Sequence, residues 1–192
     1  MTKKKYRRRS SKSHPIIPMV VGLLMIVFAF AIMSSPGPGR DEDSLSSVVP
    51  VSVQFAAPDL SLENINGKIE SLTDYRDTVV LVNNWATWCP PCKAEMPTLS
   101  AYYREHTTEG FTIIAIEAGD PGHVVAPFVQ SYNLEFPVWL DPNRDSLQAF
   151  GNGTLPNSYV IDRSGTVRYA WTGEISKAML EKYVTPLLKE DG

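Results

Sequence analysis

The feature that most constrains this fold is a pair of cysteines between a hydrophobic run and the start of a helix. The stretch NNWATWCPPCKAEMP, residues 83–97, contains Cys89 and Cys92, the two cysteines of the chain. The run TVVLVNNWA is short, continuous and largely apolar, which is typical of a central strand buried on both faces. The segment after it begins with a proline pair, which favours a helix start. The sequence therefore predicts a strand that leads into a helix at the cysteines.

The rest of the globular part alternates between strand and helix patterns. Residues 59–72 are predicted to form a hairpin, because Asn66 and Gly67 are a favoured turn pair. Residues 157–162 and 166–173 are predicted to form a second hairpin. The other expected segments are strands at 78–86, 111–118 and 136–141 and helices at 90–106, 121–133, 144–151 and 174–190, with Pro97 expected to kink the first helix. This order predicts an α/β layer fold with a mixed sheet.

Charge is distributed unevenly along the chain. The first 12 residues, MTKKKYRRRSSK, carry seven of the 18 Lys and Arg residues and no acidic residue. From residue 13 onward there are 11 basic and 21 acidic residues, a balance of −10. Nucleic-acid binding needs clustered Lys and Arg, so an acidic body of this kind argues against a nucleic-acid partner.

The basic tail is followed by an uncharged hydrophobic run, PIIPMVVGLLMIVFAFAIM, residues 15–33. A helix of about 20 apolar residues spans a bilayer, and flanking Lys and Arg keep that end in the cytoplasm. A cleaved signal peptide is the alternative, because AFA at 29–31 has the form of a cleavage site, although the run exceeds the usual ~7–15-residue core. We expect a cytoplasmic tail at 1–15, a transmembrane anchor at 16–33, a flexible linker at 34–54 and an extracytoplasmic domain at 55–192 on the cell membrane.

Two structural interpretations of the cysteine pair have little support. A tetrahedral zinc site needs four ligands, whereas the three histidines, His14, His106 and His123, are scattered along the chain. No metal is therefore expected. A purely structural disulfide between Cys89 and Cys92 would close a very small loop, which gives the least entropic stabilisation that a disulfide offers.

A redox role fits the position of the pair better. Cys89 is expected at a helix N-terminus, where the macrodipole favours a thiolate, and Cys92 lies one turn later, where it can resolve a mixed disulfide. Pro90 and Pro91 have no N–H, so the Cys92 amide is the main local donor left to the Cys89 sulfur. A thiolate with few donors argues against a very low pKa and therefore against a strong oxidant.

The stretch VVLVNNWATWCPPCKAEMP resembles the strand–helix junction of thioredoxin-fold proteins. It is most similar to the membrane-anchored, extracytoplasmic thiol–disulfide oxidoreductases of the TlpA and ResA type, and the resemblance extends over most of the globular part, through TLPNSYVIDRSGTVRYAWTG. It implies a thioredoxin-like fold with an N-terminal β-hairpin extension. It also implies a cis proline facing the disulfide, which is Pro156 here, and a substrate contact at the preceding Leu155.

The resemblance assigns roles to further residues. Asn83 stands where cytosolic thioredoxins carry a buried Asp, and an Asn cannot relay a proton from Cys92. An acid after the next strand is expected instead, with Asp120 as the first candidate and Glu117 as the second, although either can be an ordinary surface carboxylate.

Three more positions of the motif can be interpreted from the resemblance. Trp88 is expected to shield the disulfide and to offer an apolar docking surface. Glu95 is expected to be a structural charge on the helix surface. Asn84 departs from the family pattern, which has an aromatic or apolar residue at this position, and it is expected either to bond the edge of the active site or to line a substrate groove.

The expected function is that of a protein-disulfide reductase that acts as a monomer without a cofactor. Its clients would be disulfide-containing proteins, for example apocytochrome c with its haem-attachment cysteines, and a membrane electron donor of the thiol-transporter type would reduce it. The tether favours this, because it concentrates the domain beside membrane partners. A thiol oxidase or isomerase, and a non-catalytic thiol-based binding or metal-carrier module, are the alternatives.

Overall fold

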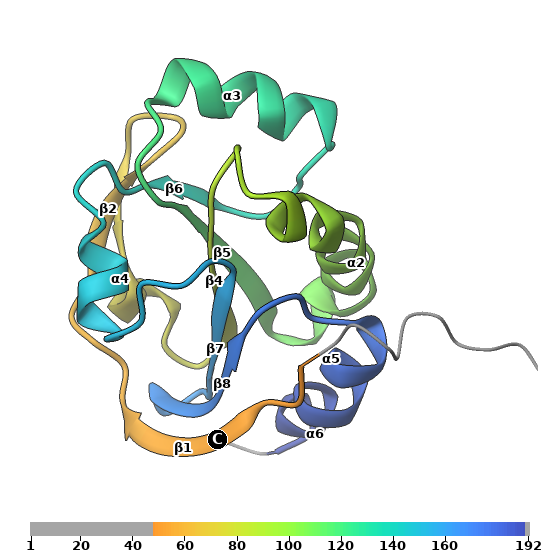
Figure 1. Ribbon diagram of the computed structural model, residues 1–192. Helices are drawn as coiled ribbons and strands as arrows, with labels where there is room; N and C mark the ends of the chain where they lie inside the picture. Colours follow the sequence, from red (N-terminus) through yellow and green to blue (C-terminus); the bar gives the residue numbers. More distant parts are fainter. Residues whose placement is uncertain (1–47, 191–192) are drawn as a thin grey trace, which may run out of the picture. The chain divides into compact units, whose positions relative to one another are not determined.

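The computed structural model describes residues 48–190, and Figure 1 shows their arrangement around one mixed sheet. Eight strands form this sheet in the order β1-β8-β7-β4-β5-β6-β2-β3. The strands are β1 Val51–Ala56, β2 Ser61–Asn64, β3 Ile69–Ser71, β4 Val79–Trp85, β5 Phe111–Glu117, β6 Val138–Leu140, β7 Asn157–Ile161 and β8 Thr166–Thr172. β4 is parallel to β5 and antiparallel to β7, so the sheet is mixed as predicted.

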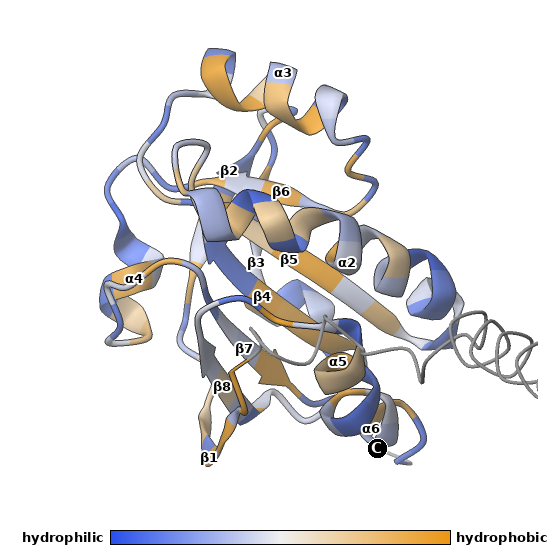
Figure 2. Cartoon of the chain, turned by 45° about the vertical axis from the view of Figure 1, so that its right-hand side comes forward, coloured by the Kyte–Doolittle hydropathy of each residue, from blue (hydrophilic) through white to orange (hydrophobic). Residues whose placement is uncertain are grey.

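Helices lie on both sides of the sheet. They are α2 Pro90–His106, α3 Gly122–Ser131, α4 Asp145–Ala149, α5 Lys177–Tyr183 and α6 Thr185–Leu188, with short 3-10 turns η2 Leu72–Tyr75 and η3 Thr107–Glu109. In Figures 1 and 2, α2 and α5 lie on one side and α4 on the other. The two sides are called the α2 face and the α4 face below.

The central strand β4 is buried along its whole length, and its side chains alternate between two hydrophobic clusters. Val79, Leu81 and Trp85 belong to the cluster on the α2 face. Val80 and Val82 belong to the cluster on the α4 face. This alternation is the two-residue period of a strand, and Figure 2 shows the hydrophobic residues along β4 and β5. Each fully buried Leu or Val side chain contributes about 1.5–3 kcal/mol of transfer free energy.

The predicted hairpins are confirmed. β2 pairs antiparallel with β3 around the Asn66–Gly67 turn, in which Gly67 has φ +81°. β7 and β8 form the second antiparallel hairpin. β2 also pairs with β6, so the first hairpin extends the edge of the sheet.

Two details differ from the expectations. β1 is a strand that the sequence does not predict. It includes residues 51–54, which the sequence assigns to the linker, and its backbone pairs with β8. The predicted closing helix at 174–190 is two helices, because Pro186 has no N–H to donate to the carbonyl four residues earlier and therefore cannot continue the first helix. α2 is a single helix that includes Pro97, and the expected kink at this proline stays a prediction.

The N-terminal segments expected to be a tail and an anchor, 1–15 and 16–33, lie outside the described residues. Within residues 48–190, no helix has both the length and the apolar composition needed to cross a bilayer.

Candidate active site

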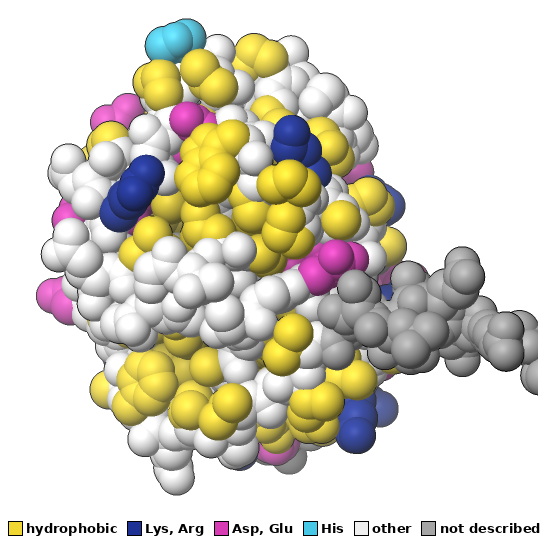
Figure 3. All heavy atoms as spheres, viewed as in Figure 1, with side chains coloured by type: hydrophobic (Ala, Val, Ile, Leu, Met, Phe, Trp, Pro, Cys, Tyr) yellow, Lys and Arg dark blue, Asp and Glu magenta, His cyan; other side chains and the backbone are white. Residues whose placement is uncertain are grey.

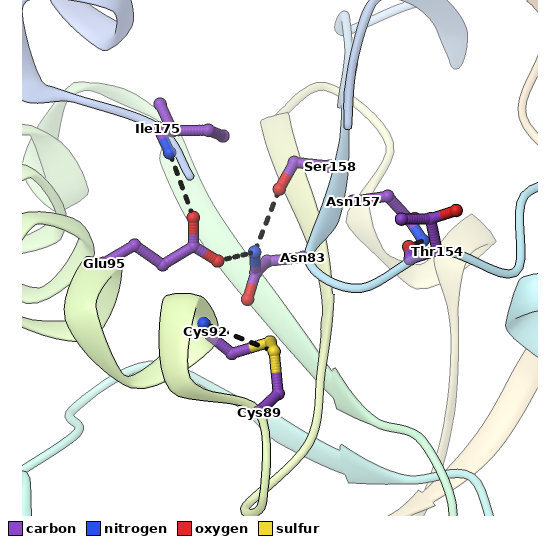
Figure 4. Close-up of a disulfide and its surroundings, with 8 residues drawn as sticks. All are labelled: Asn83, Cys89, Cys92, Glu95, Thr154, Asn157, Ser158 and Ile175. Carbon is purple, nitrogen blue, oxygen red and sulfur yellow. Dashed lines mark hydrogen bonds between the residues drawn. A yellow bond between two sulfur atoms is a disulfide. The ribbon is translucent and has the colours of Figure 1, made fainter. Parts of the chain in front are cut away.

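Cys89 and Cys92 form a disulfide at the point where β4 leads into α2 (Figure 4). Their Cα atoms are 5.3 Å apart. Cys89 is the N-cap residue of α2 and Cys92 lies in its first turn, as the sequence predicts. The Cys89 residue is 4% exposed and Cys92 is 0% exposed, so an incoming sulfur can reach only Cys89 directly.

Few local groups donate hydrogen bonds to the Cys89 sulfur. The Cys92 N–H donates to Cys89 Sγ at 3.3 Å. Pro90 and Pro91 occupy the first two helical positions and have no N–H to donate. The expected donor is therefore confirmed, and the helix macrodipole supplies the remaining local stabilisation of a Cys89 thiolate.

Glu95 is not a helix-surface charge, and this expectation was wrong. Its residue is 0% exposed, and its carboxylate accepts hydrogen bonds from Asn83 Nδ2 at 2.8 Å and from the Ile175 N–H at 3.1 Å (Figure 4). Burial raises the pKa of Glu95 to about 8, although the bonds from Asn83 and Ile175 act in the opposite direction. A side chain with this pKa exchanges a proton near neutral pH.

The sequence contained a signal for the burial of Glu95. The buried positions Cys92, Met96 and Leu99 repeat at intervals of four and three residues, which marks one face of α2. Glu95 is three residues after Cys92 and therefore shares that face. Helical spacing alone places this carboxylate in the interior, next to the redox pair in the chain.

Asn83 connects this carboxylate to the sheet. Its Nδ2 donates to Glu95 and also to Ser158 Oγ at 2.9 Å. Its Oδ1 is buried and has no hydrogen-bond partner in the described residues. Figure 4 shows this oxygen on the side of Asn83 that faces the disulfide. A buried acceptor without a donor is costly, so the site has an acceptor available next to the sulfur pair.

The two candidate acids lie together, beside the loop that precedes the cysteines. The Asp120 N–H donates to Glu117 Oε2 at 2.7 Å, and Thr87 Oγ1 donates to Asp120 Oδ2 at 2.5 Å. Glu117 is the buried member of the pair, at the end of β5 opposite Trp85. Burial is the main cause that raises the pKa of Glu117 to about 7, and the neighbouring Asp120 carboxylate raises it further.

These acids reach the redox pair through the loop rather than directly. In residues 48–190, no hydrogen bond joins either carboxylate to Cys89 or Cys92, and the connection is the bond of Asp120 to Thr87, two residues before Cys89. The structure thus brings Asp120 and Glu117 to the active-site loop. Their effect on the thiols remains a prediction.

The Leu155–Pro156 peptide bond is cis, which confirms the expected conformation. A depression with a volume of about 270 Å³ lies beside Cys89. Its lining residues are Trp88, Cys89, Pro90, Pro91, Arg144, Leu147, Gly153 and Leu155. Trp88 is 58% exposed, so it presents an apolar surface next to the disulfide.

Asn84 points to the α4 face of the sheet and does not line the depression, but it bonds to Asn157, the residue after Pro156. Its residue is 0% exposed. Its Nδ2 donates to Asn157 Oδ1 at 2.8 Å, and its Oδ1 accepts from Ser146 Oγ at 2.6 Å. Asn157 Nδ2 in turn donates to the Thr154 carbonyl at 2.6 Å. Asn84 therefore joins α4 to the loop that carries Pro156.

No metal-binding arrangement accompanies the disulfide. Within residues 48–190, no three His, Cys, Asp or Glu side chains gather in a way that would hold a metal ion.

Comparisons with known proteins agree with this geometry. The family model described as the AhpC/TSA family matches residues 53–170. The thiol-disulfide oxidoreductase ResA of Geobacillus thermodenitrificans (strain NG80-2) is 36% identical over 134 residues, which cover 70% of this chain and 77% of that protein. The ResA protein of Bacillus subtilis (strain 168) is 36% identical over 128 residues, 67% of this chain and 72% of that protein.

A solved structure supports the same assignment. The thiol:disulfide interchange protein of the thioredoxin family from Chlorobium tepidum TLS is 29% identical, with a TM-score of 0.64, and the match covers 72% of this chain and 99% of that one. The fold is therefore thioredoxin-like. The chain belongs to the AhpC/TSA family, and it is a thiol–disulfide oxidoreductase of the ResA type.

Proposed function

We propose that this chain is a membrane-anchored, extracytoplasmic reductase of protein disulfides whose catalytic residues are Cys89 and Cys92. The observation that carries the proposal is the asymmetry of the pair. Cys89 borders the depression at the N-terminus of α2, whereas Cys92 is fully buried behind it. The accessible sulfur is the attacking one and the buried sulfur is the resolving one.

The reaction proceeds through a mixed disulfide. The Cys89 thiolate attacks one sulfur of the client disulfide, the client S–S bond breaks, and the departing client thiolate takes up a proton. Cys92 then loses its proton and attacks Cys89 Sγ, which releases the second client sulfur as a thiol and forms the Cys89–Cys92 disulfide. Two electrons pass from the cysteine pair to the client.

Glu95 is the group that we assign to the Cys92 proton. It lies one helical turn beyond Cys92, and its pKa of about 8 is close to the ordinary value of a thiol, about 8.5. Asn83 holds the Glu95 carboxylate in place through Nδ2. Asp120 and Glu117 are secondary candidates that act on the loop before Cys89.

The reducing direction is supported by the small number of donors to Cys89. A strongly oxidising dithiol needs a strongly stabilised thiolate in its reduced form. The Cys92 amide and the helix dipole are the local stabilising groups, and the two prolines add no donor. This arrangement supports a moderate thiol pKa and a low reduction potential.

The membrane location and the partners rest on the sequence. We assign residues 1–15 to a cytoplasmic tail, 16–33 to an anchor, 34–54 to a linker that ends in β1, and 55–192 to the catalytic domain. The family resemblance supports apocytochrome c as one client. A membrane protein of the thiol-transporter type would restore the two electrons.

The test is the redox equilibrium of the full chain in detergent micelles against glutathione and dithiothreitol. We expect a potential well below that of the glutathione couple, because few donors stabilise the Cys89 thiolate. A reduction potential near that of strong oxidants, around −120 mV, would contradict the proposal. The Cys89→Ser variant is expected to lose all disulfide reduction, and retained activity would exclude this cysteine as the attacking group.

A further inference from the structure

The basic side chains of the described domain are few and mostly engaged. Residues 48–190 contain ten Lys and Arg residues and 17 Asp and Glu residues, a formal balance of −7. Within this part of the chain, three basic side chains have no hydrogen bond, ion pair or ring contact, namely those of Lys93, Arg144 and Lys189. Two of the three are close to the redox pair: Lys93 follows Cys92, and Arg144 lines the same depression as Cys89.

The backbone fixes the position of Arg144. This residue has φ +63°, in the left-handed region, immediately before α4. The Asp141 carbonyl accepts from its N–H at 3.2 Å, and the Asp141 carboxylate accepts from the next two amides, both at 2.8 Å. A non-glycine residue adopts this conformation only where its surroundings hold it.

The guanidinium group lies against a glycine. A Cβ atom built on Gly119 would be 3.3 Å from Arg144 Nε. Gly119 itself has φ +121°, which only glycine adopts readily. The absence of a side chain at Gly119 therefore leaves room for the Arg144 guanidinium next to the depression.

The depression combines a reactive sulfur, apolar walls and this cation. Trp88, Leu147 and Leu155 provide apolar walls around Cys89, and Arg144 provides the charged one. Figure 3 shows basic side chains at the margins of a hydrophobic area on the face where β4 leads into α2. An unpaired guanidinium in an otherwise acidic domain is complementary to a carboxylate.

The hydrogen bonds of Asn84 keep two walls of the depression together. Ser146 is two residues after Arg144, and Asn157 is two residues after Leu155. Asn84 is hydrogen-bonded to the side chains of Ser146 and Asn157. The spacing between the cationic wall and the apolar wall is thus fixed by the interior, which suits a preformed binding site.

We propose that this depression binds an extended segment of the client protein that carries an apolar side chain beside the attacked cysteine and an Asp or Glu that pairs with Arg144. The proposal rests on the proposed reductase function and specifies its substrate class. Clients with a basic residue at that position are disfavoured, because the guanidinium repels them at short range.

The experiment uses the pre-reduced full chain in detergent micelles and peptides with one internal disulfide. Each peptide has Leu beside the attacked cysteine and Glu, Gln or Lys at one of the four positions on either side. The rate constant for a single turnover is measured from the free thiols of the peptide. At one or more positions, Glu is expected to react roughly five- to tenfold faster than Lys at low salt, and the ratio shrinks as salt is added.

Matched variants assign the preference to one cation. Arg144→Asn tolerates the left-handed backbone and is expected to remove the preference, whereas Arg144→Glu reverses it. Lys189→Gln removes an equally unpaired charge and is expected to leave the preference unchanged. A preference that survives in Arg144→Asn, or one that disappears in Lys93→Gln alone, overturns the proposal. The same is true if the wild type reduces all peptides equally, whereas failure to reduce any peptide overturns the proposed function itself.

Discussion

Asn83 and Asn84 are neighbours on β4, yet their side chains enter opposite faces of the sheet. Asn83 bonds to Glu95 and Ser158 on the α2 face. Asn84 bonds to Asn157 and Ser146 on the α4 face. Both residues are 0% exposed, so burial alone does not distinguish them.

The side-chain amides of the two asparagines differ in how completely they are hydrogen-bonded. On the α4 face, both polar atoms of the Asn84 amide have neutral partners. On the α2 face, the Asn83 amide bonds to an ionisable carboxyl, and its oxygen has no donor among the described residues. A complete neutral network stabilises a structure, whereas an incomplete network with a titratable member is typical of a reactive site.

The largest expected effect is that of Glu95→Gln on the pH dependence of stability. The folded pKa of Glu95, about 8, is above its ordinary value of 4.5, so its contribution to stability is complete below pH 4.5 and is lost as pH rises to 8. The free energy of unfolding of the wild type relative to the variant should fall by about 1.4 kcal/mol per pH unit in that window, or about 5 kcal/mol in all. Denaturant unfolding of the oxidised proteins measures this difference.

The Glu117 carboxyl titrates in both proteins and cancels in that difference. Parallel curves for the wild type and Glu95→Gln would contradict a raised pKa for Glu95. We also expect the mixed disulfide to be resolved more slowly in Glu95→Gln than in the wild type at pH 7.

A smaller effect is expected from Asn84→Leu, which removes two buried hydrogen bonds. The free energy of unfolding should fall by about 3 kcal/mol, because Asn157 and Ser146 lose a buried partner. The reduction potential of the cysteine pair should not change, since the network lies on the α4 face. Chemical denaturation and redox equilibration check the two statements separately. A shifted potential would show that the two faces are coupled.

The corresponding change on the α2 face is Asn83→Ala. Its hydrogen bond lowers the pKa of Glu95, so that pKa should rise above about 8 in the variant. The loss of stability at neutral pH should be about 1–2 kcal/mol, because Glu95 is largely protonated there and retains the Ile175 bond. Carboxyl NMR titration of Glu95 measures the shift, and Asn84→Leu is the control in which it is absent.

The smallest effect is expected from Asp120→Asn. The Asp120 carboxylate raises the pKa of Glu117, so that pKa should fall below about 7 in the variant. The free energy of unfolding should change by less than about 1 kcal/mol, because Asp120 is partly exposed and the amide retains an acceptor for Thr87. NMR titration of Glu117 and thiol titration of Cys89 and Cys92 check this. Unchanged thiol curves would remove Asp120 from the active site.

The sequence predicts the features of this site that are local in the chain. The buried strand, the helix start and the proline pair around Cys89 and Cys92 lie within one continuous segment, so periodicity and proline geometry suffice. The cis bond before Pro156 was predicted only through the family resemblance. Glu95 was misassigned, although its spacing from Cys92 places it on the buried face of α2.

The sequence alone does not predict contacts between residues that are far apart in the chain. The partners of Asn84 are 62 and 73 residues away in the chain, and no local pattern connects such positions. Nor does composition show that residues 51 and 52 pair with β8, since a strand at the sheet edge depends on its neighbour. The unpaired state of Arg144 likewise depends on the whole surrounding surface.

The hydrogen bonds of Asn84 have a consequence for how related chains diverge. A large apolar side chain at this position would leave the hydroxyl of Ser146 and the amide of Asn157 without their central partner. Substitutions at the three sites are therefore expected to accumulate together, so that in an alignment of relatives a hydrophobic residue at position 84 is accompanied by apolar or small residues at 146 and 157. Asn83 should vary independently of this trio and instead in step with Glu95.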